Sequence, residues 1–140
     1  MRRYPDCRAA KQLGFDNGAA QALVSILMRL RSDIFVSALI RRAEAQGAVA
    51  MLRRRGAAEA GAIFVKLDRL DGRAAVYGPA PQSEELPMGV DRLFARVHAD
   101  DWLDPAGAEQ RLKREIMFDP DLWIVEIEDR EGRVFVDLAA

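Results

Sequence analysis

The chain has 140 residues, 50% of them hydrophobic and 31% charged, and its formal net charge is −1. That length provides one domain with a buried core, and the absence of a strong positive charge argues against a typical nucleic-acid binder. The single cysteine, Cys7, rules out an internal disulfide, and the longest uncharged run, residues 17–28, is shorter than the roughly 20 apolar residues of a membrane-spanning helix. We therefore expect a cytoplasmic protein that is not attached to a membrane.

The N-terminal stretch differs from the rest of the chain. Residues 1–16 have no hydrophobic periodicity, although residues 19–30 place apolar side chains at the spacing of a short helix. The character of the sequence changes at Met28, which has the features of an internal start. We expect residues 1–27 to be a tail or a mis-called start that could include a short helix, and residues 28–140 to form a single domain.

A helix, a strand and a hairpin are predicted in the first half of this domain. Apolar residues at helical spacing predict an amphipathic helix over residues 33–46, with Ser32 as its N-cap. A short apolar run then predicts a strand over residues 48–55, which becomes basic at its end. Two β-rich runs, residues 61–67 and 73–78, are joined through an Asp-Gly turn and predict a hairpin.

The second half is predicted to contain a strand, a helix and another hairpin. Residues 92–98 alternate as a strand, and a helix begins at Asp104-Pro105 and ends near residue 118. Residues 122–138 have the densest β-branched and aromatic content, so we expect them to form the hairpin on which the sheet is anchored. This order predicts an α+β fold: a single two-layer domain whose largely antiparallel sheet has its helices packed on one face.

Basic and acidic residues are unevenly distributed along the chain. Residues 29–73 contain ten Lys/Arg and five Asp/Glu, whereas residues 115–140 contain two and eight. The basic half either faces the acidic half and is neutralised, or forms a face that attracts an anion, because guanidinium groups suit carboxylates and phosphates. Our candidate binding residues are Arg41, Arg42, Arg53 and Arg54, together with Tyr77 and Gln82 in a proline-rich loop that could form a second surface.

Few residues could carry catalysis or bind a cofactor. The chain has no nucleotide-binding, nucleophile-elbow or paired-cysteine motif, so we expect no cofactor. His98, the sole imidazole, follows an alternating run and is interpreted as a strand-end residue rather than a catalytic base. Asp119, Asp121 and Glu126 could gather oxygen ligands for Mg²⁺, although Asp119 and Asp121 also suit the turn geometry around Pro120.

Five phrases of the sequence are distinctive. They are Met-Arg-Leu-Arg-Ser at residues 28–32, Arg-Arg-Arg-Gly at 53–56, Gly-Ala-Ile-Phe-Val-Lys at 61–66, Tyr-Gly-Pro-Ala-Pro-Gln at 77–82 and Phe-Asp-Pro-Asp-Leu-Trp-Ile-Val-Glu at 118–126. Together they resemble a small alphaproteobacterial family catalogued as domain of unknown function 1491. The likeness spans residues 28–138 and implies no particular activity. It also implies that residues 1–27 lie outside the shared pattern, since members of the family begin near the position of Met28.

The missing catalytic motifs and the uneven charge favour a binding domain over an enzyme. Our first hypothesis is a non-enzymatic domain that binds a protein or a small anionic partner; nucleic acid is not expected. One alternative is a metal-assisted hydrolase or nuclease that uses the C-terminal carboxylates. Another is a homodimeric structural or adaptor domain that forms by pairing of a free strand edge.

Overall fold

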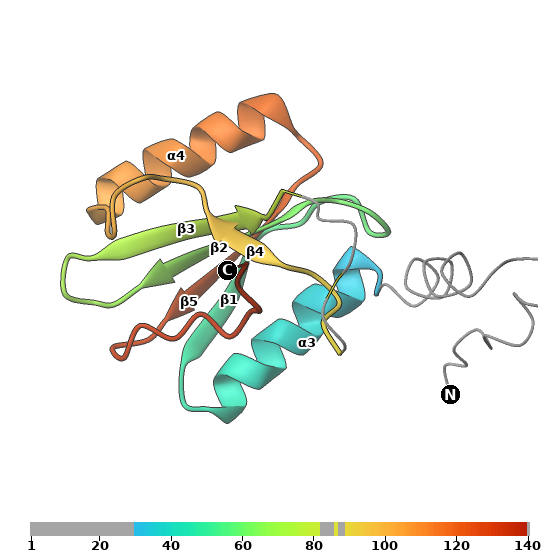
Figure 1. Cartoon of the computed structure of the whole chain (residues 1–140), viewed down its shortest axis with the longest axis horizontal. Coiled ribbons are helices and arrows are strands. Elements are labelled where there is room, and N and C mark those ends of the chain that lie inside the picture. Colours follow the sequence, from blue (N-terminus) through green and yellow to red (C-terminus); the bar gives the residue numbers. More distant parts are fainter. Residues whose placement is uncertain (1–29, 82–85, 87–88, 140) are drawn as a thin grey trace, which may run out of the picture. The chain divides into compact units, whose positions relative to one another are not determined.

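A computed structural model describes residues 30–81, 86 and 89–139 of the chain (Figure 1). Residues 19–29 of the predicted N-terminal helix and the candidate Gln82 lie outside these residues. None of the helices in the described residues is long and apolar enough to cross a membrane. The domain boundary at residue 28 remains a prediction.

The chain divides into two compact units. The smaller unit consists of Met1–Leu30 and Ser83–Arg92. Within it, the Arg92 guanidinium donates to the Leu30 carbonyl at 2.8 Å, and the Leu30 amide donates to the Asp91 carboxylate at 2.8 Å. The larger unit consists of Arg31–Gln82 and Leu93–Ala140, and it contains the helices and strands of the described residues.

Five strands of the larger unit form one sheet, in the order β1-β5-β2-β3-β4. Their bounds are β1 Val49–Arg54, β2 Ile63–Asp68, β3 Ala74–Pro79, β4 Phe94–Arg96 and β5 Trp123–Glu128. β5 is antiparallel to β1 and parallel to β2, and the other neighbouring strands are antiparallel. The hairpin predicted from the Asp-Gly turn is confirmed as β2 and β3. β5, the last strand within the described residues, lies between the first two, β1 and β2.

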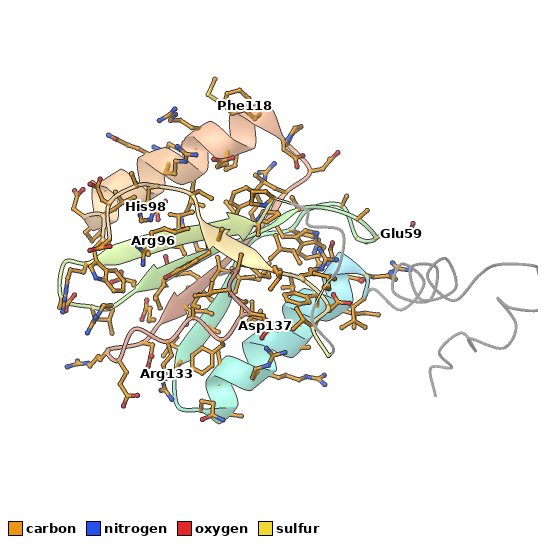
Figure 2. All side chains as sticks on the ribbon, viewed as in Figure 1. Glu59, Arg96, His98, Phe118, Arg133 and Asp137 are labelled. Atoms are coloured by element: carbon orange, nitrogen blue, oxygen red, sulfur yellow. The ribbon has the colours of Figure 1, made fainter. Side chains whose placement is uncertain are left out.

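Two helices cover the sheet, α3 (Ser32–Ala45) and α4 (Pro105–Phe118). Ile124 of β5 packs in a core cluster with Leu112 of α4, whereas the adjacent Trp123 lines a hollow together with residues of α3. Successive side chains of a strand point to opposite faces, so the two helices lie on opposite faces of the sheet. Figure 1 shows α4 and α3 on either side of the strands, and Figure 2 draws the side chains of both helices and of the sheet in the same view.

The α+β class and the mostly antiparallel sheet are therefore confirmed. The structure differs from the prediction in one respect: α3 and α4 cover opposite faces of the sheet, so helix, sheet and helix form three layers in the described residues. The physical reason is visible in the central strands. The first five residues of β2, of β3 and of β5 are all buried, so the side chains on both faces of these strands require cover.

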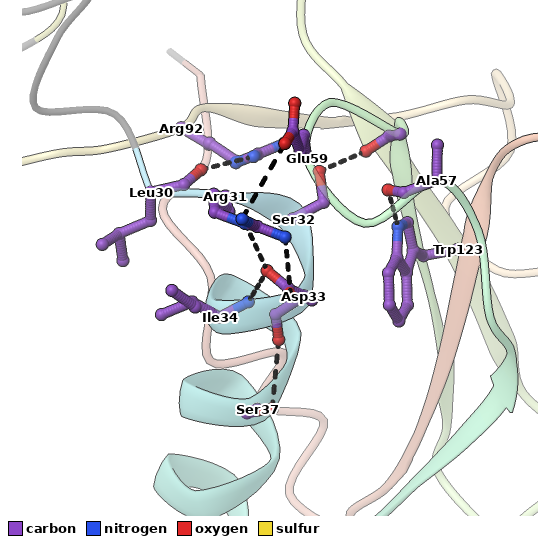
Figure 3. A network of polar contacts seen from close by, with 11 residues as sticks. Leu30, Arg31, Ser32, Asp33, Ile34, Ser37, Ala57, Glu59, Arg92 and Trp123 are labelled. Carbon is purple, nitrogen blue, oxygen red and sulfur yellow. Dashed lines mark hydrogen bonds and ion pairs between the residues drawn. The ribbon is translucent and has the colours of Figure 1, made fainter.

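The N-terminus of α3 is capped by a loop instead of by its own serine. Ser32 is the first helical residue, and its hydroxyl donates to the Gly61 carbonyl at 2.6 Å. The backbone N–H groups of Ser32 and Asp33 donate to carbonyls of the loop at 3.1 and 3.0 Å (Figure 3). These bonds satisfy donors that every helix leaves free in its first turn. The prediction of Ser32 as the N-cap is wrong by one position.

The same loop, residues 56–61, is pressed against the start of β5. The Trp123 indole N–H donates to the Ala57 carbonyl at 2.7 Å (Figure 3). A Cβ added to Gly56 would lie 2.2 Å from the Asp121 carbonyl oxygen, which is closer than a Cβ approaches an atom to which it is not bonded. Glycine is therefore required at residue 56 for the loop to reach this strand.

Only the first half of the predicted hairpin over residues 122–138 is a strand. After β5, the Asp129 carboxylate accepts from the Arg133 amide at 2.7 Å, and Phe135 has a φ of 62°, outside the β region. The chain then crosses to β4, where the Phe94 amide donates to the Asp137 carbonyl at 2.8 Å. The prediction was wrong because the local bonds of Asp129 turn the chain away from its own strand.

Candidate binding site between α3 and β1

The structure distributes the four candidate arginines over different surroundings. Arg53 contacts carboxylates beneath α4, and Arg54 donates to the Pro120 carbonyl at 2.7 Å. Arg42 donates to a backbone carbonyl of the C-terminal segment at 2.8 Å. Arg41 is exposed and lines a hollow beside α3. Of the second candidate surface, Tyr77 is buried in β3. The four arginines are thus not gathered on one surface.

Arg53 belongs to a compact cluster of four charged side chains beneath α4. Lys66 Nζ lies 2.7 Å from Glu109 Oε1 and 3.2 Å from Glu126 Oε1. Arg53 Nη1 lies 3.0 and 2.8 Å from the same two oxygens. Two positive and two negative charges meet here, and they join the edge strand, two central strands and the helix. The contacts of Arg53 and Lys66 with Glu126 are a local instance of the basic stretch 29–73 being neutralised by the acidic stretch 115–140.

The protonation of this cluster is set by its hydrogen bonds. Bonds from Arg53 and Lys66 lower the pKa of Glu109 from 4.5 to about 2. Burial by itself lowers the pKa of Lys66, but its bonds to Glu109 and Glu126 outweigh that effect and raise the pKa. Lys66 is therefore held as an ammonium ion, which lacks the lone pair that a nucleophile or general base needs. The four charged groups of the cluster therefore pair with one another, and Lys66 does not act as a nucleophile or base.

The three candidate magnesium ligands have other roles in the structure. Asp119 Oδ1 accepts from the Asp121 backbone N–H at 3.0 Å and closes the turn before β5. Asp121 is exposed, and Glu126 belongs to the charged cluster. In the part of the chain that the structure describes, no group of three or more His, Cys, Asp or Glu side chains is placed to hold a metal ion.

His98 lies just after β4 and bonds to the backbone through both ring nitrogens. Its Nε2 accepts from the Val76 N–H at 3.0 Å, so the proton of the neutral ring must reside on Nδ1. Nδ1 lies 2.8 Å from the Asp100 carbonyl oxygen, which accepts a hydrogen bond from this N–H. Burial lowers the pKa of His98 below its usual value. Both nitrogens thus hold the 98–100 turn against β3.

A hollow of about 460 Å³ lies between α3 and the edge strand β1. Figure 1 shows α3 running beside β1. Apolar and basic side chains line the hollow, and Trp123 contributes from the adjacent strand β5. Its lining residues are Asp33, Ile34, Val36, Ser37, Ala38, Ile40, Arg41, Leu52, Arg55 and Trp123. Because it is concave and has both apolar and charged lining residues, we take this hollow as the candidate binding site.

The hollow combines apolar walls with two arginines, Arg41 and Arg55, for which the described residues provide no ion-pair partner. Ile34 on α3 and Leu52 on β1 are large apolar side chains, and each remains 38% exposed. Arg55 lies over the Trp123 ring, 5.5 Å from its centroid, in a cation–π arrangement. The one carboxylate in the lining, that of Asp33, is already bound by Arg31, 3.3 Å away. Arg41 and Arg55 therefore give the hollow a net attraction for anions.

Arg55 was absent from the predicted site because a β-bulge changes the register of the arginine run. Leu52 is opposite Val125, but Arg54 is opposite Ile124, so Arg53 is inserted as an extra residue. A regular strand would direct alternate arginines to alternate faces, and Arg54 would be the one beside Trp123. The bulge shifts this position by one residue and presents Arg55 to the hollow. No pattern in the sequence marks the bulge.

Comparison with known proteins identifies relatives of the chain. The family model described as "Protein of unknown function (DUF1491)" matches residues 30–137. No curated protein matches the chain. Among solved structures, a DUF1491 family protein from Caulobacter crescentus CB15 is 37% identical, with a TM-score of 0.66 over 81% of this chain and 100% of that one. Protein Atu0922 from A. tumefaciens is 43% identical, with a TM-score of 0.68 over 80% of this chain and 96% of that one.

Proposed function

The chain belongs to the DUF1491 family. We propose that it is a non-enzymatic binding domain. In this proposal, the hollow between α3 and β1 binds an acidic, partly apolar segment of a protein partner. The observation that carries the proposal is the joint presence of exposed apolar walls, Ile34 and Leu52, and two arginines without a competing free carboxylate. Protein interfaces favour this combination of apolar anchors and arginine.

The chemistry of the hollow selects among the kinds of ligand. A small inorganic anion would satisfy the arginines but would leave Ile34 and Leu52 in water. An apolar ligand would cover these side chains but would remove the hydration of Arg41 and Arg55 without replacing it, which is unfavourable. A peptide segment that directs both an apolar side chain and an aspartate or glutamate side chain into the hollow satisfies both requirements. We also place this activity in the cytoplasm, since the sole cysteine gives no sign of an oxidising compartment.

The proposal is tested by selection from a phage-displayed library of random octapeptides on the full chain. We expect enriched peptides to contain an apolar residue one or two positions from Asp or Glu, with dissociation constants that increase with salt. The variant Arg41→Glu/Arg55→Glu should weaken their binding by at least about tenfold, because two exposed charge contacts of up to about 1 kcal/mol each are lost and replaced by repulsion. Leu52→Glu should have an effect of similar size.

A matched control changes the same charges elsewhere. Lys113 and Arg114 are exposed on α4, on the opposite face of the sheet. Lys113→Glu/Arg114→Glu changes the net charge of the chain by the same amount and should alter peptide binding by less than about twofold beyond general screening. Failure to enrich any peptide, or equal loss in both double variants, would overturn the proposal.

A further inference from the structure

The two edges of the sheet differ in how their backbone groups are used. At the β4 edge, the Phe94 amide donates to the Asp137 carbonyl at 2.8 Å and the Phe94 carbonyl accepts from the Ala139 amide at 2.8 Å. The C-terminal segment thus covers that edge. At the other edge, β1 pairs with β5 on one side, and no strand of the described residues pairs with its other side. An uncovered strand edge presents a row of free N–H and C=O groups.

We infer that the partner segment binds as an added sixth strand along the free edge of β1, over Val49–Leu52, with its alternate side chains directed into the hollow beside α3. This inference rests on the proposed function and specifies its geometry. Leu52 belongs both to the free edge and to the hollow, so one extended segment can reach backbone partners and the hollow together. A paired strand would lie about 4.8 Å from β1, and every second side chain would project toward α3.

The length of the pairable edge is limited by the bulge. The regular register of β1 covers four residues, Val49 to Leu52, before the shift between Leu52 and Arg54. A bulge bends the strand and interrupts its ladder, so added pairing ends there. The basic residues that follow would lie beside the end of the docked segment. A ligand of this edge is therefore a short strand with carboxylates at the end that passes Arg55.

Charge decides between an acidic partner and a second copy of this chain. A second copy would offer β1 itself, a strand whose only charged residues are Arg53 and Arg54 and which is followed directly by Arg55. Positive charges at a strand edge are a known means of preventing such self-pairing. An acidic strand meets the opposite condition, because its carboxylates approach arginines that have little local compensation.

The test uses the peptide fluorescein-Gly-Thr-Val-Thr-Leu-Thr-Glu-Thr-Glu-amide, whose apolar and acidic side chains lie on one face of a strand with the carboxylates at one end. Two further versions are N-methylated, one at the threonines and the other at the alternating Val, Leu and Glu residues. Methylation removes an N–H donor and keeps the side chain. In strand pairing only alternate residues of the peptide direct their N–H groups toward β1. We expect one methylated version to bind at least about tenfold more weakly than the parent peptide and the other to bind within about threefold of it, as measured by fluorescence polarisation with the full chain.

Amide hydrogen exchange gives a second readout on the protein. The outward-facing N–H groups of Val49–Leu52 should exchange at least about tenfold more slowly with saturating parent peptide, while the Phe94 N–H, already bonded, should not change. Equal binding of both methylated peptides, with no new protection in β1, would overturn strand addition but leave the hollow as a binding site. If peptides selected from the library bind the chain but the unmethylated parent peptide does not, strand addition would also be overturned. Protection of β1 without peptide in a concentration-dependent dimer would assign the edge to a second copy.

Discussion

Replacing Lys66 by methionine should destabilise the domain by about 3 kcal/mol. The Lys66 side chain is 6% exposed and contacts both Glu109 and Glu126. Without its ammonium group, Glu126 stays 11% exposed and has Arg53, 2.8 Å away, as its remaining cation among the described residues. Removal of one partner from a buried ion pair usually costs about 3–5 kcal/mol, and we take the lower end because Arg53 remains.

The interaction itself is isolated by a double-mutant cycle. Glu126→Met should also cost about 3 kcal/mol, because it leaves Lys66 with the partly exposed Glu109 alone. The double variant Lys66→Met/Glu126→Met removes both buried charges and keeps the pair between Arg53 and Glu109, whose two contacts measure 3.0 and 3.1 Å. Its cost should therefore be about 3 kcal/mol rather than the sum of the singles, which gives a coupling energy of about 3 kcal/mol.

Urea unfolding followed by tryptophan fluorescence measures these free energies. The dependence of the unfolding free energy on urea should be unchanged, since the variants alter contacts and not the surface exposed on unfolding. Lys113→Met, at an exposed position of α4, is the control and should stay within about 0.5 kcal/mol of the parent chain. If the double variant loses about 6 kcal/mol, the effects are additive, and the two charges do not stabilise each other as the distances imply.

Three further predictions concern protonation and packing. The pKa of Glu109 is lowered from 4.5 to about 2, so its carboxylate stabilises the fold fully above pH 4.5 and loses this effect as the pH falls toward 2. Glu109→Gln should therefore make the unfolding free energy less dependent on pH over this range. If the unfolding free energy of the variant decreased with acid as in the parent chain, the assignment would be contradicted. The pKa of His98 is lowered, so its contribution to the unfolding free energy is present above about pH 6.5 and decreases below it. ¹⁵N chemical shifts of the ring should show the Nδ1–H tautomer. An Nε2–H tautomer would contradict the hydrogen bond from the Val76 N–H. Gly56→Ala should cost at least about 2 kcal/mol in thermal or urea unfolding, because its Cβ would lie 2.2 Å from the Asp121 carbonyl oxygen; a neutral effect would mean that the loop moves freely.

The helices and the β2–β3 hairpin could be predicted from the sequence because their signals are local. The apolar spacing before Gly47 and the Asp104-Pro105 start each specify one helix without reference to the rest of the chain. The Asp-Gly turn specifies the hairpin in the same way. These features depend on residues within one or two turns of each other.

The arrangement of the layers depends on contacts between distant residues. The runs Ile63–Leu67 and Trp123–Ile127 are apolar nearly throughout, and this continuity was a usable sign that both faces of the sheet are covered. The C-terminal segment was predicted as a strand because Val134 and Val136 suit one. There the bonds between Asp129 and Arg133 compete with strand pairing, and a scale of β propensity does not contain them.

The candidate site was predictable in its residue type but not in its members. The sequence singled out the basic run 53–55 and Arg41 as functional candidates, and of these Arg41 and Arg55 line the hollow. The sequence could not reveal that Arg53 is bound by two glutamates or that a bulge presents Arg55 beside Trp123. Both facts are set by the pairing of β1 with a strand that lies about seventy positions further along the chain.

The position of β5 between β1 and β2 constrains how the polypeptide can fold while it is being made. As the nascent chain leaves the ribosome, α3 and β1 emerge early, but β1 has no ladder partner in the described sheet until β5 follows. The β2–β3 hairpin can close by itself, whereas β1 is linked to it in the sheet only through β5. We expect this order to leave an apolar helix and an open strand edge exposed for most of translation, a period in which a nascent-chain chaperone would have the same surfaces available to it.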